Sequence, residues 1–162
     1  MRSPTSLCFL LLVGCATCVP SLFADEVKPK KEAKDDANIL EGSWNGIALE
    51  VDGKKVPVEV LEKLKGRFTF KGLELLMTDT TPISGGKATV KLDSGKTPKQ
   101  IDLTGIEGAG KGKTTQGIYK FEKDRLFICL RGPEFAEKGR PTEFKTEVGS
   151  GLGLMTLERV KE

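Results

Sequence analysis

The side chains that most often do chemistry at neutral pH are scarce in this chain, which contains no histidine. Histidine is the usual general base and the commonest metal ligand. Its absence excludes the Ser-His-Asp and Cys-His nucleophilic arrangements and the histidine-rich type of catalytic zinc site. Carboxylate chemistry and the binding of hard cations by oxygen ligands stay open.

Several carboxylates lie at expected turns or on polar strand faces. They are Glu50, Asp52, Asp79, Asp93, Asp102 and Asp124. Two carboxylates can hydrolyse a glycoside only at a set separation across a cleft, which a sequence does not show. The chain has no regular Asp-x-Asp-x-Asp-Gly calcium loop. We therefore expect solvated surface charge, with no catalytic residue and no bound metal.

The glycine-rich stretch from Gly105 to Thr114 is similar to a phosphate-binding loop but misses that pattern in both registers. If the pattern starts at Gly105, Gly112 stands where a Ser or Thr should bind magnesium. If it ends at Thr114, Glu107 takes the first glycine position, and its charge would repel phosphate. Such a loop also opens a helix, whereas the residues after Thr114 are strand-like. We expect a hairpin loop and no cofactor.

Cys129 is the one cysteine that lies outside residues 1–24. If that segment is removed, no intramolecular disulfide can form. Cys129 belongs to the apolar run from Leu126 to Leu130, so we expect it to behave as a small buried hydrophobe. A reactive thiol is the less favoured interpretation, because the chain has no histidine to activate it.

Residues 1–24 have the features of a cleaved secretory signal. Arg2 supplies the positive start, and Leu7 to Val13 is an apolar run too short to span a bilayer. Ala24 is a small residue suited to the cleavage position. We therefore expect an exported protein, periplasmic or extracellular.

A second interpretation of the N-terminus stays open. The residues from Leu12 to Cys15 resemble a bacterial lipobox, whose cysteine is lipidated after cleavage. Contact with a membrane is expected only through such an anchor at Cys15. Residues 25–38 are charged in both signs and almost free of apolar side chains, which predicts a flexible tether. The folded domain is then expected over residues 39–162.

The domain is predicted to be all-β with one short helix. Phe68 and Phe70 share one strand face, and similar alternation recurs along the chain between glycine-rich turns. The exception is the segment 57–65, where a proline precedes apolar residues at helical spacing. A long open meander leaves two unpaired edges, and closure removes them. We predict a small antiparallel up-and-down barrel of about eight strands, with a β-sandwich as the alternative.

The chain also carries an ordered set of short motifs. They are residues 40–44 (LEGSW), 51–57 (VDGKKVP), 98–103 (PKQIDL), 110–114 (GKGKT), 117–119 (GIY), 129–130 (CL), 140–144 (RPTEF) and 157–160 (LERV). This set resembles an uncharacterised domain family of exported planctomycete proteins over nearly all of residues 39–161. The resemblance implies a lipocalin-like fold. It does not indicate an activity, because the family has none established.

Trp44, within Gly42-x-Trp44, is similar to the tryptophan that opens a lipocalin barrel. The resemblance implies that this ring closes one barrel end and that an arginine from the end of the barrel packs across it. Arg159 on the last expected strand is the matching residue. A guanidinium over an indole face contributes roughly 0.5–2 kcal/mol. An ordinary core role for Trp44 stays open, and either role is structural.

Charged residues make up 30% of the chain and the net charge is only +3, without the basic stripe of a nucleic-acid binder. We expect a non-catalytic binding or interaction domain and no nucleic acid partner. It would hold an unknown small apolar ligand in the barrel. The alternative is an envelope structural or protein-interaction module with a filled barrel.

Overall fold

The computed structural model describes residues 35–64, 66–78 and 86–161. Its strands are β1 (Gly42–Val51), β2 (Lys54–Lys55), β3 (Arg67–Lys71), β4 (Glu74–Thr78), β5 (Gly86–Asp93), β6 (Lys99–Gly105), β7 (Thr114–Glu122), β8 (Arg125–Arg131) and β9 (Leu152–Arg159). Residues 35–40 are helical, α2 spans Val58–Leu64, and η1 is a 3₁₀ helix at Pro133–Lys138. The helix predicted over residues 57–65 is therefore confirmed.

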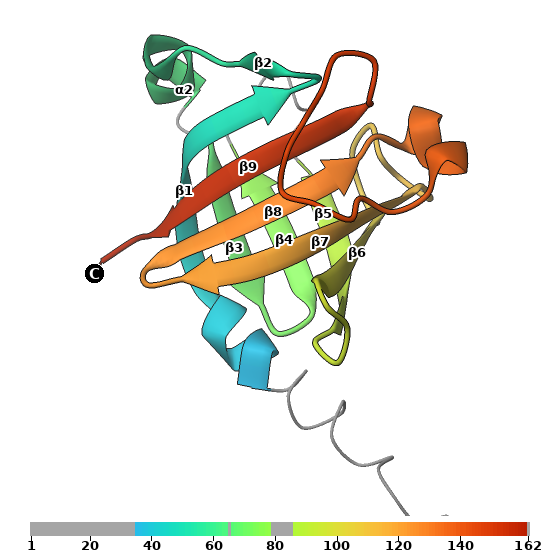
Figure 1. Ribbon diagram of the computed structural model, residues 1–162. Coiled ribbons are helices and arrows are strands. Elements are labelled where there is room, and N and C mark those ends of the chain that lie inside the picture. Colours follow the sequence, from blue (N-terminus) through green and yellow to red (C-terminus); the bar gives the residue numbers. More distant parts are fainter. Residues whose placement is uncertain (1–34, 65, 79–85, 162) are drawn as a thin grey trace, which may run out of the picture.

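The strands form one closed antiparallel barrel (Figure 1). From β3 to β9 each strand pairs with the next along the chain, and β1 pairs with both β3 and β9. The short β2 pairs only with the end of β1 and stays outside the ring of eight. The predicted up-and-down barrel is confirmed, and the β-sandwich alternative is wrong because β1 and β9 close the sheet on itself.

Local turn chemistry sets the strand connections. Asp52 and Gly53 both take positive φ angles, 53° and 78°, as a two-residue hairpin turn between β1 and β2 requires. Lys123 has φ 55° in the equally tight turn between β7 and β8. An Asp-Gly dipeptide is typical of such a two-residue turn. Tight turns keep consecutive strands adjacent, which is why the meander follows chain order.

The two ends of the barrel are built differently (Figure 1). The helical residues 35–40 lie across one end, which we call the capped end. The β1–β2 turn, the β6–β7 loop and the long β8–β9 connection lie at the other. This asymmetry follows from an up-and-down barrel, in which alternate connections fall at opposite ends.

The barrel interior is an apolar core. Its buried members are Leu40, Trp44, Phe68, Phe70, Leu75, Ala88, Val90, Ile101, Leu103, Tyr119, Leu126, Ile128 and Leu157. Most come from the alternate positions that the sequence pattern assigned to one strand face. Large aromatic side chains gather near the capped end, where the Trp44 and Phe121 ring centroids are 6.5 Å apart.

The alternation of side chains along β1 is interrupted. A strict period of two would place Ile47, Leu49 and Val51 on one face, but a β-bulge between Gly46 and Ala48 shifts the register of β1 against β9. An extra residue in one strand breaks the simple alternation and bends the strand. The bulge lies just beyond the four residues of β1 that pair with β3, before the stretch that pairs with β9 and, at its end, with β2.

The boundary predicted for the tether is wrong at its end. Residues 35–38 were assigned to a flexible tether, yet they belong to the helix at the capped end, and Asp36 is only 4% exposed. The folded domain therefore includes Asp35 and the residues after it. The predicted signal at residues 1–24, with Cys15, and the rest of the tether lie outside the described residues.

Candidate functional site

Trp44 and Arg159 meet at the capped end, as predicted. They are direct partners in the β1–β9 pairing, and the Arg159 guanidinium carbon lies 4.5 Å from the Trp44 ring centroid. Trp44 is 2% exposed and donates its indole N–H to the Leu40 carbonyl at 2.7 Å. Arg159 also donates to the carbonyl oxygens of Glu41, at 2.8 Å, and Ile39. The pair thus holds the chain that precedes β1.

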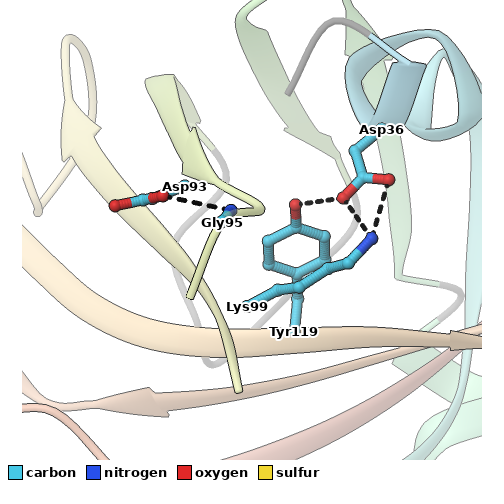
Figure 2. Close-up of polar contacts among 5 residues, drawn as sticks. All are labelled: Asp36, Asp93, Gly95, Lys99 and Tyr119. Carbon is cyan, nitrogen blue, oxygen red and sulfur yellow. Dashed lines mark hydrogen bonds and ion pairs between the residues drawn. The ribbon is translucent and has the colours of Figure 1, made fainter. Parts of the chain in front are cut away.

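A second polar cluster fixes the same helical segment (Figure 2). Tyr119 Oη donates to Asp36 Oδ2 at 2.6 Å, and Lys99 Nζ donates to both Asp36 carboxylate oxygens at 2.8 and 3.0 Å. Figure 2 shows the Tyr119 hydroxyl and the Lys99 ammonium reaching the carboxylate from two neighbouring strands. Asp93 accepts a separate hydrogen bond from Gly95. A buried carboxylate so satisfied is a structural anchor.

The electrostatics of this cluster keep the tyrosine protonated. Burial, followed by the hydrogen bond to Asp36 and the negative charges of Asp36 and Asp93, raises the pKa of Tyr119 above its ordinary value. The hydroxyl is therefore a hydrogen-bond donor at neutral pH. Tyr119 thus supplies a hydrogen-bond donor for the Asp36 carboxylate, and Lys99 supplies its counter-ion. The sequence did not predict this cluster, because Asp36 and its two partners are far apart along the chain. The signal available was the one tyrosine on an inward strand face, whose hydroxyl needs a partner when buried.

The irregular segment 139–151 runs from η1 back to β9 and is anchored to the barrel by side chains. Arg140 donates to the carbonyl oxygens of Ile101 and Gly117, at 3.0 and 2.6 Å, and pairs with Asp102 at 2.6 Å. The Arg140–Asp102 ion pair joins this segment to β6. It is a structural contact, because the guanidinium is occupied by acceptors of the barrel wall.

Asp52 anchors the other end of that segment. Its carboxylate accepts hydrogen bonds from the backbone N–H groups of Gly149, at 2.9 Å, and Gly151, at 3.0 Å. These two bonds hold the pKa of Asp52 below its ordinary value. Thr146 adds a hydrogen bond to the carboxylate of Glu50 and accepts one from the Gly53 N–H at 3.0 Å. Two of the carboxylates considered in the sequence are thus structural.

Cys129 is fully buried, as predicted. Its neighbours across the sheet are Ile118 and Leu154, on the strand face that points away from the barrel core. Burial raises the pKa of the Cys129 thiol to about 11, with the charge of Arg131 as a smaller opposing effect. The thiol is neutral near pH 7 and has no nucleophilic thiolate to offer.

The barrel end opposite the helix has a different character. Met77, Leu130 and Met155 pack against the core from the inward face but are only partly buried. Leu49 pairs directly with Met155, and Gly153 pairs directly with Leu130. Leu49 and Gly153 therefore lie on the same inward face as their partners. We call these five residues the mouth. An added Cβ at Gly153 would meet no atom of residues 35–64, 66–78 or 86–161 within 4 Å, so these residues leave free space beside it.

The surface also carries shallow polar grooves. One of about 430 Å³ lies along the segment 139–151 and is lined by Arg131, Lys138, Arg140 and Lys145, among others. Within it, Lys145 is paired with two acids, since its ammonium lies 2.9 Å from Glu143 and 3.4 Å from Glu147. Among residues 35–64, 66–78 and 86–161, no group of three or more acidic, cysteine or histidine side chains could hold a metal ion.

Comparisons with known proteins assign no relative. No family model, no curated protein and no solved structure matches the chain. The resemblance to an exported planctomycete family stays a prediction. Within the part of the chain that the structure describes, no helix has the length and apolar character needed to cross a membrane.

Proposed function

We propose that this protein is an exported, non-catalytic binding domain that holds a small apolar ligand at the mouth of its barrel. The observation that carries the proposal is the free space at Gly153, next to partly exposed, inward-facing Leu130 and Met155. Binding sites are concave and mostly apolar, and small barrels hold ligands at such an end. Burial of apolar surface would supply the affinity, at about 25 cal/mol per Å².

The chemistry of the mouth favours a ligand with little hydrogen-bonding capacity. Leu49, Met77, Leu130 and Met155 offer no strong donor or acceptor, so a polar ligand buried among them would lose its bonds to water without replacement. The two methionines add a soft, polarisable surface that adapts to different shapes. A non-catalytic role suits this composition, because no acid, base or nucleophile is among the five mouth residues.

The compartment belongs to the same proposal. A signal at residues 1–24 would export the domain to the periplasm or beyond, as in the planctomycete family that it resembles. Mass spectrometry of the native protein is expected to find an N-terminus at Asp25. A diacylglycerol group on Cys15 would instead make it a lipoprotein, and an intact Met1 would contradict export in either form.

The binding proposal is tested by filling the mouth. Purified protein is titrated with anilinonaphthalene sulfonate, an amphiphilic fluorophore whose aromatic rings brighten when they leave water, while its sulfonate can stay in solvent. We expect one saturable site in the wild type. Gly153→Leu should weaken binding by about tenfold or more, because the new side chain occupies the free space while keeping an extended backbone.

The matched control is Thr156→Leu on the same strand. Thr156 pairs with Phe127 on the outward face, so this variant adds a similar apolar group outside the barrel. Its affinity for the fluorophore should stay near that of the wild type. Equal affinity in Gly153→Leu and wild type would contradict a site at the mouth, and so would the absence of saturable binding in the wild type.

A filled barrel that acts through its outer surface is the second candidate. Exposed apolar side chains favour it, with Val58 on α2 58% exposed and Val148 in the segment 139–151 79% exposed. In that case the fluorophore would bind irrespective of Gly153→Leu, and Val148→Asp would reduce its binding. The two candidates therefore give opposite results with the same probe.

A further inference from the structure

Two inward-facing positions beside the mouth are glycines. Gly86 pairs with Met77 and Gly105 pairs with Ala88, so a side chain at either glycine would point toward the barrel interior. Glycine inside a strand costs stability and often marks a close approach of another backbone. Gly86 and Gly105 have no positive φ angle, so backbone conformation does not explain them.

The backbone of the β6–β7 loop fills the places of the two missing side chains. A Cβ at Gly105 would lie 2.1 Å from the carbonyl oxygen of Gly110, and a Cβ at Gly86 would lie 2.6 Å from that of Glu107. Both distances are far inside van der Waals contact. Residues 106–113, which we call the cover loop, therefore lie over the inward face where β5 begins and β6 ends.

The cover loop is held in this position by backbone hydrogen bonds. The N–H of Ile106 donates to the Lys87 carbonyl at 2.7 Å, and the N–H of Gly112 donates to the Gly105 carbonyl at 2.9 Å. The N–H of Gly105 donates to the Lys113 carbonyl at 3.0 Å. These bonds make the cover loop a defined part of the barrel rim. The loop belongs to the glycine-rich stretch from Gly105 to Thr114, which does not match a phosphate-binding loop.

We propose that the cover loop narrows the mouth and so sets the size of the apolar ligand that enters. The inference rests on the proposed binding function and assigns Gly86 and Gly105 as specificity-determining residues. With the β5–β6 side covered, the part of the chain that the structure describes leaves free space on the side of Gly153. The site is therefore suited to a slim apolar group and discriminates against a bulky one.

The discrimination is measured with two probes of the same chemistry: anilinonaphthalene sulfonate and its covalent dimer, which is about twice the size. We expect the wild type to favour the smaller probe. In Gly105→Ala the new methyl group must displace the cover loop, so the preference should fall by about tenfold. Gly110→Ala is the matched control, because a Cβ there meets no atom within 4 Å and should change nothing.

A second readout needs no ligand. Met77 pairs with Gly86, beside the cover loop, whereas Met155 lies across the mouth on β9. Displacing the loop should speed the oxidation of Met77 by hydrogen peroxide in Gly105→Ala and in Gly86→Ala, with Met155 little changed. Peptide mass spectrometry measures both rates, and Gly110→Ala should match the wild type.

The outcomes separate the two proposals. Unchanged Met77 oxidation in both variants would overturn the cover loop, and so would equal acceleration at Met77 and Met155, which indicates general loosening. If oxidation responds but neither probe binds the wild type, the cover loop stands and the binding function fails. If the probes bind but their ratio is unaffected by Gly105→Ala, the binding function stands and the loop has no part in specificity.

Discussion

At the scale of residues, Trp44 and Arg159 show how side chains at the capped end join segments distant in sequence. Trp44 binds the Leu40 carbonyl and lies under the Arg159 guanidinium, which in turn binds the carbonyl of Glu41. The two residues therefore couple the first strand, the last strand and the helical segment. Each contact is modest alone, but they share atoms and should act together.

Substitution of this pair should reveal that coupling. Trp44→Ala is expected to lower the free energy of unfolding by about 3–5 kcal/mol, as for a large buried aromatic. Arg159→Ala should cost less, because its guanidinium is near the surface, and the double variant should cost less than the sum. Denaturant unfolding measures all three values. Strict additivity would show that the stacking contributes nothing.

The sequence predicted this pair but not the cluster around Asp36. A tryptophan and an arginine on the first and last strands must come close if the barrel closes, so topology alone brings them together. Asp36 lies in a charged stretch whose composition is that of a solvated chain. Nothing local distinguishes its carboxylate from Asp35 beside it, and only the folded positions of Tyr119 and Lys99 do.

At the scale of elements, the helical residues 35–40 are part of the domain. A chain that begins at Asp35 keeps the Asp36 anchor, and one that begins at Ile39 loses it. The shorter chain should be less stable by about 1–3 kcal/mol, because the Tyr119 hydroxyl and the Lys99 ammonium lose their partner. Thermal unfolding of both chains, with Asp36→Ala in the full chain as control, measures this. Equal melting temperatures would place the boundary at Ile39 after all.

Regular elements were more predictable than irregular ones. Alternation of apolar residues between glycine-rich turns sufficed to predict strands and an antiparallel order. The β-bulge near Ile47 and the path of the cover loop depend on contacts that no local pattern encodes. Glycine at positions 86 and 105 allows a close backbone approach in the structure, and nothing in the sequence indicates which backbone approaches.

At the scale of the whole molecule, the barrel has one packed end and one end with free space. Closure through β1 and β9 removes the sheet edges that could otherwise pair with another chain. The large aromatic side chains and the helical segment 35–40 fill the capped end. Partly exposed apolar residues and Gly153 leave room at the other, so binding is expected at the mouth alone.

The most direct test is to map the bound probe by methyl NMR spectroscopy. Titration with anilinonaphthalene sulfonate should shift the methyl signals of Leu49, Leu130 and Met155, which line the mouth. The methyl signals of Ile101, within the packed core, should stay in place. Shifts confined to exposed side chains such as Val148, with the mouth signals unmoved, would contradict the account and favour a filled barrel that acts through its outer surface.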